Sequence, residues 1–395
     1  MAEVEYRHFR VELDPNNRQR TALAKAAGAA RFAWNWGLSR RIEEYEKTGK
    51  GTNPIAQHRE LLALKNDQLC WLHDVSKWVP QESLADLARA FVRFFRRVKS
   101  GEKPGFPKFK RKREGRGSFR LCGVEVDVTS ARLARIGWVR LKERGYIPAG
   151  RKIVWATIIE RYGRWFLAVS CEFPACSPAP NGKPSVGVDL GVKTFAVLST
   201  GQSFVAPRPL ARLEGRTRIL NKKLERSKKG GRNRAKLIAR IGNAHRRAYN
   251  ARADFLHKLT THLAKNHGLV AIEDLCVEGM LKNRSLGRHV ADARFAEFRH
   301  MLEYKTRKYG SRLAVASRTY PSSKRCSACG RVKNRLALSD REYACDSCGL
   351  KMDRDLNAAI NILVAASSAE TQNACRAISS LAMKQEPGSI ALAGA

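Results

Sequence analysis

The first hundred residues begin with a strand-like pattern and continue with a helical one. Residues 4–13 (VEYRHFRVEL) alternate apolar and polar side chains, which predicts a strand. Asp14-Pro15-Asn16 then starts a region that extends to about residue 99, and its apolar positions recur at helical spacing. We interpret the aromatic residues of this helical region as packing residues, and base stacking is the alternative.

Short strand-like runs return between residues 120 and 174. Together with the first strand they predict a small β-barrel that the helical region interrupts. The segment 174–184 (PACSPAPNGKP) is rich in proline and polar residues, so the main domain boundary is predicted there.

Beyond that boundary, apolar strands alternate with strongly basic helices. The predicted strands lie within 185–201, 268–274 and 311–318. Two basic segments, 213–229 and 232–266, flank Gly230-Gly231, which predicts a helix hairpin. The whole chain is therefore predicted to be an α+β multidomain protein.

The charge balance predicts a polyanionic partner. Lys and Arg total 75 against 36 Asp and Glu, which gives a formal net charge of +39 in 395 residues. Nucleic acid is the first choice, and a membrane surface is the alternative, although no amphipathic anchor or lipidation motif is present. No apolar run approaches the roughly 20 residues of a membrane-spanning helix, and the N-terminus lacks a secretory apolar core. We expect a cytoplasmic protein without a membrane partner.

Two basic segments are candidates for contacts with phosphate groups. In 105–113, phenylalanines alternate with Lys and Arg, so nucleic-acid contact and a plain linker both remain open. The helix predicted over 232–266 has an almost purely positive face, which favours phosphate binding over a solvated face. The candidate residues are Lys108, Lys110, Arg111, Lys112, Arg113, Arg240, Arg246 and Arg247.

Four cysteines have the spacing of a zinc site. They form C-x2-C-x15-C-x2-C, with a glycine directly after each pair; the four are Cys326, Cys329, Cys345 and Cys348. Two such knuckles supply the four thiolates of a closed, structural Zn²⁺ site. A redox dithiol pair and unligated thiols are the alternatives, and the six other cysteines are scattered.

Three carboxylates lie where elements with apolar bodies end or begin. Asp189 is near the end of one predicted strand, Glu273 ends another, and Asp355 opens the helical run DLNAAINILVAA. Carboxylates at such positions can converge on a pair of hard divalent ions, which prefer oxygen ligands. Two ions about 4 Å apart can hold the attacking and leaving oxygens of a phosphodiester. The pattern predicts a two-metal nuclease site.

The combination of these motifs resembles the TnpB (OrfB) family of insertion sequences, apparent relatives of compact type V CRISPR effectors. Within seven residues the last cysteine is followed by RDLNAAINI, and the strand motifs VGVDLG and AIEDL precede the cysteines. The resemblance covers residues 183–365, and more loosely 105–113 and the N-terminal organisation.

The resemblance implies a RuvC nuclease domain of RNase H-like fold with an inserted zinc ribbon, and an N-terminal wedge-like β-barrel with a helical recognition lobe. The expected boundaries are 1–15 and 100–178 for the barrel, 16–99 for the recognition lobe, 183–321 and 351–366 for the nuclease domain, 322–350 for the ribbon, and 367–395 for a disordered tail.

The resemblance also assigns roles. Asp189, Glu273 and Asp355 match the three RuvC carboxylates, which would bind Mg²⁺ or Mn²⁺. Asp353 is close, but the family's aspartate stands two residues before the asparagine of N-A-A, Asn357, so Asp355 is the expected ligand.

The implied activity is that of an RNA-guided DNA endonuclease that reads a short motif beside its target. Its partners would be a guide RNA encoded by the transposon and double-stranded target DNA, with the protein on the nucleoid while it is bound to DNA. Two alternatives remain: a nuclease-inactive, RNA-guided DNA-binding repressor, and a standalone RuvC-like structure-selective nuclease. Transposon or CRISPR context, and monomer or dimer, remain open.

Overall fold

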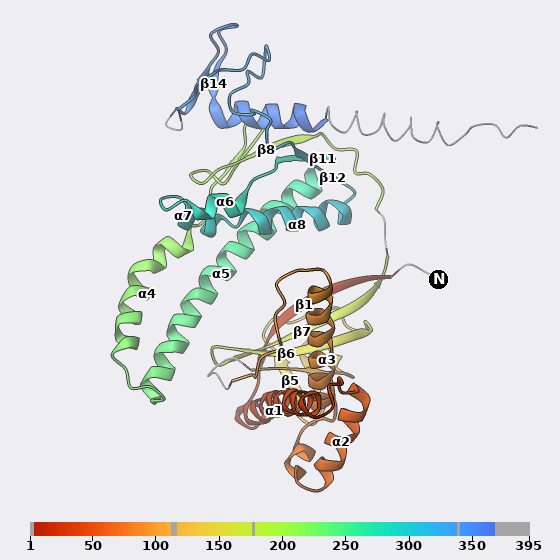
Figure 1. Cartoon of the computed structure of the whole chain (residues 1–395). Helices are drawn as coiled ribbons and strands as arrows, with labels where there is room; N and C mark the ends of the chain where they lie inside the picture. The colour runs from red at the N-terminus through yellow and green to blue at the C-terminus, as the bar shows by residue number, and fades with distance from the viewer. Residues whose placement is uncertain (1–3, 112–116, 176–177, 338–339, 368–395) are drawn as a thin grey trace, which may run out of the picture. The chain divides into compact units, whose positions relative to one another are not determined.

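The computed structural model describes residues 4–111, 117–175, 178–337 and 340–367 (Figure 1). These residues form two compact units. The first contains the described residues up to 175 together with Leu220–Asn243, and the second contains those from 178 to Ile219 and from Ala244 onward. Of the predicted tail, 367–395, only Ser367 is described, and it lies in a helix.

The first unit is built on a seven-stranded sheet with the order β2-β6-β7-β1-β5-β4-β3, in which every pairing is antiparallel. Its strands are β1 (Val4–Asp14), β2 (Ser118–Leu121), β3 (Glu125–Val126), β4 (Ser130–Leu133), β5 (Gly137–Leu141), β6 (Ile153–Arg161) and β7 (Arg164–Pro174). The strands expected in 4–13 and 120–174 are therefore present. The closure of this sheet into a barrel stays a prediction.

Helices come between β1 and β2 in the first unit, as the pattern predicted. They are α1 (Asn17–Thr48), α2 (Pro54–Asn66), the 3₁₀ helix η1 (Cys70–Asp74) and α3 (Trp78–Lys99). Asn16 caps α1 in a reciprocal capping box with Gln19, which explains why the helix begins there. Gly37 lets α3 approach α1 closely, because a Cβ atom at this position would lie 2.5 Å from Leu84 Cδ2. The interpretation of Phe32 and Trp34 as packing residues agrees with their contacts in the core.

The second unit contains a five-stranded sheet with the order β10-β9-β8-β11-β12. Its strands are β8 (Val186–Leu190), β9 (Ala196–Leu198), β10 (Ser203–Phe204), β11 (Leu269–Glu273) and β12 (Arg312–Ala316). The three strands β8, β11 and β12 are parallel, whereas β9 and β10 form an antiparallel extension after β8. The carboxyl ends of the parallel strands therefore meet at one edge, where a ligand site is expected.

The helices in this part of the chain are α4 (Pro209–Glu225), α5 (Arg232–Asn266), α6 (Val277–Lys282), α7 (Gly287–Ala293), α8 (Phe295–Lys308) and a helix over 354–367. Residues of α5 and α8 pack on one face of the sheet and the helix over 354–367 packs on the other, so the unit has three layers. The hairpin of α4 and α5 joins at Gly230, as predicted, and is divided between the two units.

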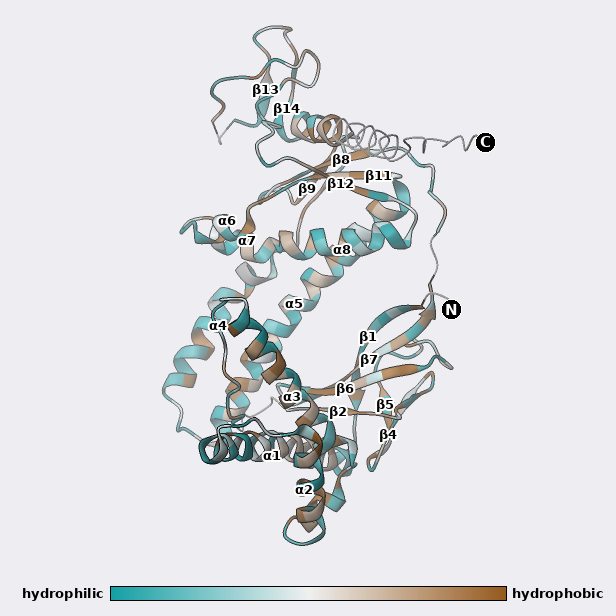
Figure 2. Ribbon diagram, turned by 45° about the vertical axis from the view of Figure 1, so that its right-hand side comes forward, coloured by the Kyte–Doolittle hydropathy of each residue, from teal (hydrophilic) through white to brown (hydrophobic). Residues whose placement is uncertain are grey.

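The strand residues alternate between the two faces. Val188 and Ile272 pack with residues of α5 and α8, whereas Ala271 packs with Ile362 of the helix over 354–367. Both faces are apolar, and β8 and β11 accordingly carry hydrophobic colours (Figure 2).

The cysteine segment lies between β12 and the last helix. It contains an isolated bridge from Arg325 to Val332 and a hairpin of β13 (Glu342–Ala344) and β14 (Lys351–Asp353). β14 leads directly into the helix over 354–367. No described helix of this chain combines the length and apolarity that a membrane span requires.

Candidate functional site

The parallel sheet places Asp189 and Glu273 side by side. Asp189 is the penultimate residue of β8, and Glu273 is the last residue of β11. These strands pair in parallel up to Ile272 opposite Val188, so the next residues along the two strands are Glu273 and Asp189. Both carboxylates belong to the face that the helix over 354–367 covers.

A glycine brings the third carboxylate to the same place. A Cβ atom on Gly187 would lie 2.0 Å from the Ala359 carbonyl oxygen and 2.9 Å from Leu363 Cβ, so the helix rests directly on this strand. Asp189 is two residues beyond Gly187 on the same face of β8. Asp355 is four residues before Ala359, one turn away on the same helix face. The close approach at Gly187 therefore sets Asp355 over the end of β8.

Burial, and at Asp189 also the neighbouring negative charges, raise the pKa of two of the three carboxylates. The pKa of Asp189 is raised well above its usual range, first by burial and then by the charges of Glu273 and Asp355. Burial raises the pKa of Glu273 to about 6, although the backbone N–H of Leu190 donates a hydrogen bond to its carboxylate. Buried like charges of this kind are relieved by cations, and an all-oxygen donor set suits Mg²⁺ or Mn²⁺.

Asp353, the alternative to Asp355, has another role in the structure. Its Oδ1 accepts hydrogen bonds from the backbone N–H groups of Asp355 (2.9 Å) and Leu356 (3.0 Å). This is the geometry of a helix N-cap, which satisfies the free amides of the first turn. The capping role of Asp353 leaves Asp355 as the candidate ligand.

The four cysteines form a compact cluster. Sγ atoms of Cys326 and Cys348 are 3.6 Å apart, and those of Cys329 and Cys345 are also 3.6 Å apart. Sulfurs at about 2.3 Å from a tetrahedral zinc are separated by about 3.8 Å, so this cluster fits the ion.

Local backbone geometry supports both cysteine turns. Gly330 and Gly349 have φ angles of 78° and 72° and donate hydrogen bonds to the carbonyls of Cys326 and Cys345. Backbone N–H groups of Cys348 and Ser347 lower the pKa of Cys345 to about 6, which favours the thiolate that binds metal. The four-cysteine cluster could therefore hold a metal ion such as zinc.

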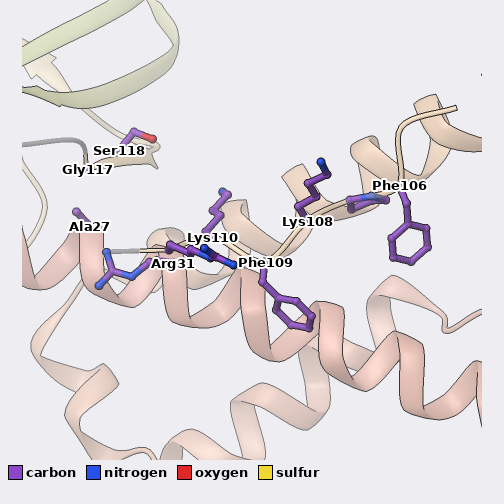
Figure 3. A pocket seen from close by; sticks show the side chains of 10 residues that line it. Ala27, Arg31, Phe106, Lys108, Phe109, Lys110, Gly117 and Ser118 are labelled. Atoms are coloured by element: carbon purple, nitrogen blue, oxygen red, sulfur yellow. The ribbon is translucent and has the colours of Figure 1, made fainter. Parts of the chain in front are cut away.

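The basic segment 105–113 is anchored on α1 in its described part, residues 105–111. Trp34 Nε1 donates to the Lys108 carbonyl (3.0 Å), and the side chain of Asn35 both donates to and accepts from the Lys110 backbone (2.9 and 2.7 Å). Beside the segment is an open groove of about 800 Å³, lined in part by Arg31 and Arg111 (Figure 3).

The candidate phosphate-binding residues of this segment differ in what their side chains contact. Lys108 and Phe109 extend to opposite sides of the segment (Figure 3), and Phe109 is 51% exposed. Lys110 is exposed as a residue, but its ammonium group lies 3.8 Å from the centroid of the Trp34 ring, where desolvation lowers its pKa. Lys110 thus fastens the segment to α1. Lys112 and Arg113 lie outside the described residues.

The arginines predicted on the long basic helix lie on α5. Arg240 and Arg247 are exposed, whereas Arg246 is half-buried and has an interaction partner within the protein. The exposed pair is therefore better placed for a phosphate contact than Arg246.

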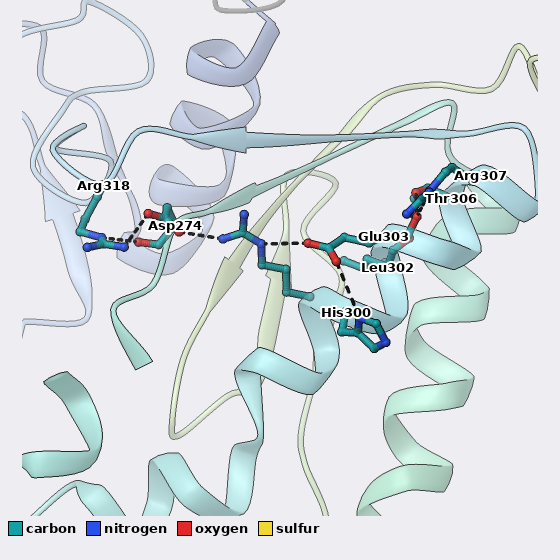
Figure 4. Close-up of polar contacts among 8 residues, drawn as sticks. Asp274, His300, Leu302, Glu303, Thr306, Arg307 and Arg318 are labelled. Atoms are coloured by element: carbon teal, nitrogen blue, oxygen red, sulfur yellow. Dashed lines mark hydrogen bonds and ion pairs between the residues drawn. The ribbon is translucent and has the colours of Figure 1, made fainter. Parts of the chain in front are cut away.

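One charged network was not predicted from the sequence. Asp274, which directly follows β11, accepts hydrogen bonds from Arg299 and Arg318, each at 2.7 Å, and Arg299 also pairs with Glu303 (Figure 4). These arginines hold the pKa of Asp274 low. The end of β11 is thereby tied to α8 and to the segment after β12. The one feature of the sequence that could have pointed to this network is the aspartate directly after Glu273.

Sequence families match three parts of the chain. Residues 168–284 match OrfB_IS605, described as "Probable transposase"; residues 295–362 match "Cas12f1-like, TNB domain"; and residues 5–50 match the "Helix-turn-helix domain" of OrfB_IS605. In the structure, 5–50 holds most of β1 followed by the single long helix α1.

Individual relatives cover nearly the whole chain. A protein of Streptomyces pristinaespiralis named "Putative RNA-guided DNA endonuclease" is 34% identical over 91% of this chain and 89% of its own length. The Escherichia coli K12 protein "Putative RNA-guided DNA endonuclease InsQ" is 31% identical over 90% of this chain and 91% of its own.

A solved structure shares the fold. The protein in the cryo-EM structure of a Cas12f1–sgRNA–target DNA complex matches with a TM-score of 0.51 at 14% identity, over 91% of this chain and 98% of the other. The chain therefore has a mixed α/β fold similar to that of a compact Cas12f effector. From its relatives and its motifs alike, the chain belongs to the TnpB (OrfB) family of insertion sequences.

Proposed function

We propose that this protein is an RNA-guided DNA endonuclease of a transposon. The observation that carries the proposal is the convergence of Asp189, Glu273 and Asp355 at the carboxyl edge of the parallel strands. Relatives over 30% identical across nine-tenths of the chain bear the name of this activity. The retained carboxylates favour a nuclease over a nuclease-inactive repressor.

The chemistry is hydrolysis of a DNA phosphodiester. Divalent ions, Mg²⁺ or Mn²⁺, would supply an activated water and stabilise the leaving 3′ oxygen. Asp189, Glu273 and Asp355 would hold these ions. The Leu190 amide orients the Glu273 carboxylate, and the cap at Asp353 fixes the turn that carries Asp355.

The proposed domains follow the expected boundaries. Residues 183–321 and 351–366 form a RuvC domain of RNase H-like fold, and 322–350 form its zinc ribbon. Residues 1–15 and 100–178 form a wedge-like barrel, and 16–99 a recognition lobe. The parallel core β8-β11-β12 with helices on both faces supports the first of these assignments.

The partners are a guide RNA encoded by the transposon and double-stranded DNA. A net charge of +39 supports a polyanionic partner, and exposed Arg240 and Arg247 are proposed phosphate contacts. Base pairing with the guide would select the target. These partners place the protein in the cytoplasm, on the nucleoid while it is bound to DNA.

The test compares single alanine variants of the triad with a matched aspartate control. Asp189→Ala, Glu273→Ala and Asp355→Ala should each abolish Mg²⁺-dependent cleavage while the protein still binds RNA. Asp254→Ala removes an exposed carboxylate paired with Lys258 on α5, and its cleavage rate should match that of the wild type. Cleavage at the wild-type rate by any of the three triad variants would contradict the proposed site.

A further inference from the structure

Two buried asparagines fasten the cysteine segment to the helix that carries Asp355. Asn357 and Asn361 lie one turn apart on this helix and are 0% and 2% exposed. Buried amides require hydrogen-bond partners, since leaving one unpaired carries the full cost of its desolvation. Both find theirs on the backbone around the first cysteine turn.

The four hydrogen bonds enclose Cys326. Asn357 accepts from the backbone N–H of Ser327 (2.9 Å) and donates to the carbonyl of Arg325 (2.7 Å). Asn361 donates to the same Arg325 carbonyl (2.6 Å) and to the carbonyl of Ser322 (2.9 Å). The residues immediately before and after Cys326 are therefore both tied to this helix.

The second cysteine turn reaches the same helix through the chain itself. Cys345 and Cys348 lie in the hairpin of β13 and β14, and β14 ends at Asp353, the cap of the helix. The backbone N–H of Arg354 also donates to the Arg341 carbonyl (2.8 Å). Asp355 thus lies between two attachments, one to each half of the four-cysteine cluster.

Apolar packing alone would leave the helix freer. Ile362 and Ala366 press the helix onto the sheet, but such contacts are non-directional and tolerate rotation and sliding. The hydrogen bonds of the two buried side-chain amides prevent both the rotation and the sliding of the helix, because a hydrogen bond tolerates only a small range of distances and angles.

We propose that Asn357 and Asn361 are positioning residues through which the four-cysteine ribbon holds Asp355 in place, so that the divalent-metal site depends on a metal-loaded ribbon. The inference rests on the proposed role of Asp355 as a metal ligand. Asn357 and Asn361 need not touch the substrate or the catalytic ions.

The first test uses the unaltered protein. Hydrogen exchange of residues 354–367 is measured in magnesium-free buffer before and after a chelator removes zinc. Amides of the first turn should exchange roughly tenfold faster or more once the ribbon is empty, while those of α8 stay unchanged. Unchanged exchange in the first turn would overturn the proposal. Because this readout involves no cleavage, it is independent of whether Asp355 binds a catalytic ion.

The second test uses Asn357→Ala and Asn361→Ala. Both should still bind one zinc per chain but lose it faster to a chelator, and both should need roughly 10–100-fold more Mg²⁺ for half-maximal cleavage. The matched control is Asn181→Ala, which removes hydrogen bonds to the His267 and Ala264 carbonyls at the opposite ends of the parallel strands. It should leave both the zinc release and the Mg²⁺ requirement unchanged.

An unchanged Mg²⁺ requirement in folded Asn357→Ala and Asn361→Ala would overturn the coupling. If neither variant folds, the exchange experiment on the unaltered protein decides the question. Retained cleavage in Asp355→Ala would instead refute the proposed function, which separates the two failures.

Discussion

Replacing Gly187 by alanine tests how the proposed nuclease site is assembled. The added Cβ atom would lie 2.0 Å from the Ala359 carbonyl oxygen, whereas ordinary contact begins at 3.4 Å. The obstacle is backbone, not the end of a flexible side chain, so the helix over 354–367 must retreat by about 1.4 Å. Leu363 Cβ, at 2.9 Å, blocks the same space.

The retreat should affect catalysis more than stability. Overpacking of this kind typically costs about 1–3 kcal/mol, which a folded unit of this size can tolerate. Asp355 lies one turn from the clash and moves with the helix. A displacement of about 1 Å at a reacting centre can lower a rate about 100-fold.

The assay is cleavage of target DNA at saturating guide RNA and Mg²⁺, with thermal unfolding to establish the folded fraction. Gly187→Ala should cleave about 100-fold more slowly while it still binds RNA. Gly215→Ala on α4 is the control, because nothing lies within 4 Å of its added Cβ atom. Wild-type cleavage by folded Gly187→Ala would refute the argument that this contact positions Asp355.

Asp353→Ala removes the helix cap, so it should lower stability by about 1 kcal/mol. In a cleavage assay this variant should still cut DNA, whereas Asp355→Ala should not. Cleavage by Asp355→Ala and none by Asp353→Ala would make Asp353 the ligand. The pKa of Glu273, raised from 4.5 to about 6, means that its contribution to stability is present below pH 4.5 and is lost as pH rises through 6. Glu273→Gln should therefore stabilise the magnesium-free protein by about 2 kcal/mol at pH 8 but not below pH 4.5. Thermal unfolding that shows the same stabilisation at both pH values would contradict this. Elemental analysis should find one zinc per chain, and Cys345→Ser should lower the unfolding temperature; a zinc-free protein purified without chelators would count against the ribbon. A plot of log RNA affinity against log salt concentration should have a slope of about −0.7 per phosphate contact. Charge reversal of Arg240 and Arg247 should weaken binding to all RNA sequences alike, so a loss of affinity that depends on sequence would argue against phosphate contacts.

The sequence alone was sufficient for the elements that carry the site. Apolar runs ending at Asp189 and Glu273 predicted two buried strands, and the structure pairs them in parallel with these residues as neighbours. The cysteine spacing predicted a cluster that the structure forms. Both patterns are local, because strand ends and cysteine turns are set by a few adjacent residues.

Contacts between distant segments could not be predicted in this way. Nothing in VGVDLG shows that Gly187 must accommodate the helix at Ala359, since that requirement exists only once the two elements pack. The contact of Lys110 with Trp34, 76 residues earlier in the chain, is likewise invisible in the sequence, and the predicted phosphate contact of Lys110 stays a prediction. The arginines that hold Asp274 come from α8 and from the segment after β12. Each of these interactions depends on tertiary geometry.

The central claim is that a bound RNA directs cleavage by the site at Asp189, Glu273 and Asp355. The most direct measurement exchanges the target-pairing segment of the copurified RNA and maps the cut sites on DNA that contains both the old and the new matching sequences. The cut should move to the new match, require Mg²⁺ and disappear in Asp355→Ala. Cleavage by RNA-free protein with unchanged target choice would contradict the account.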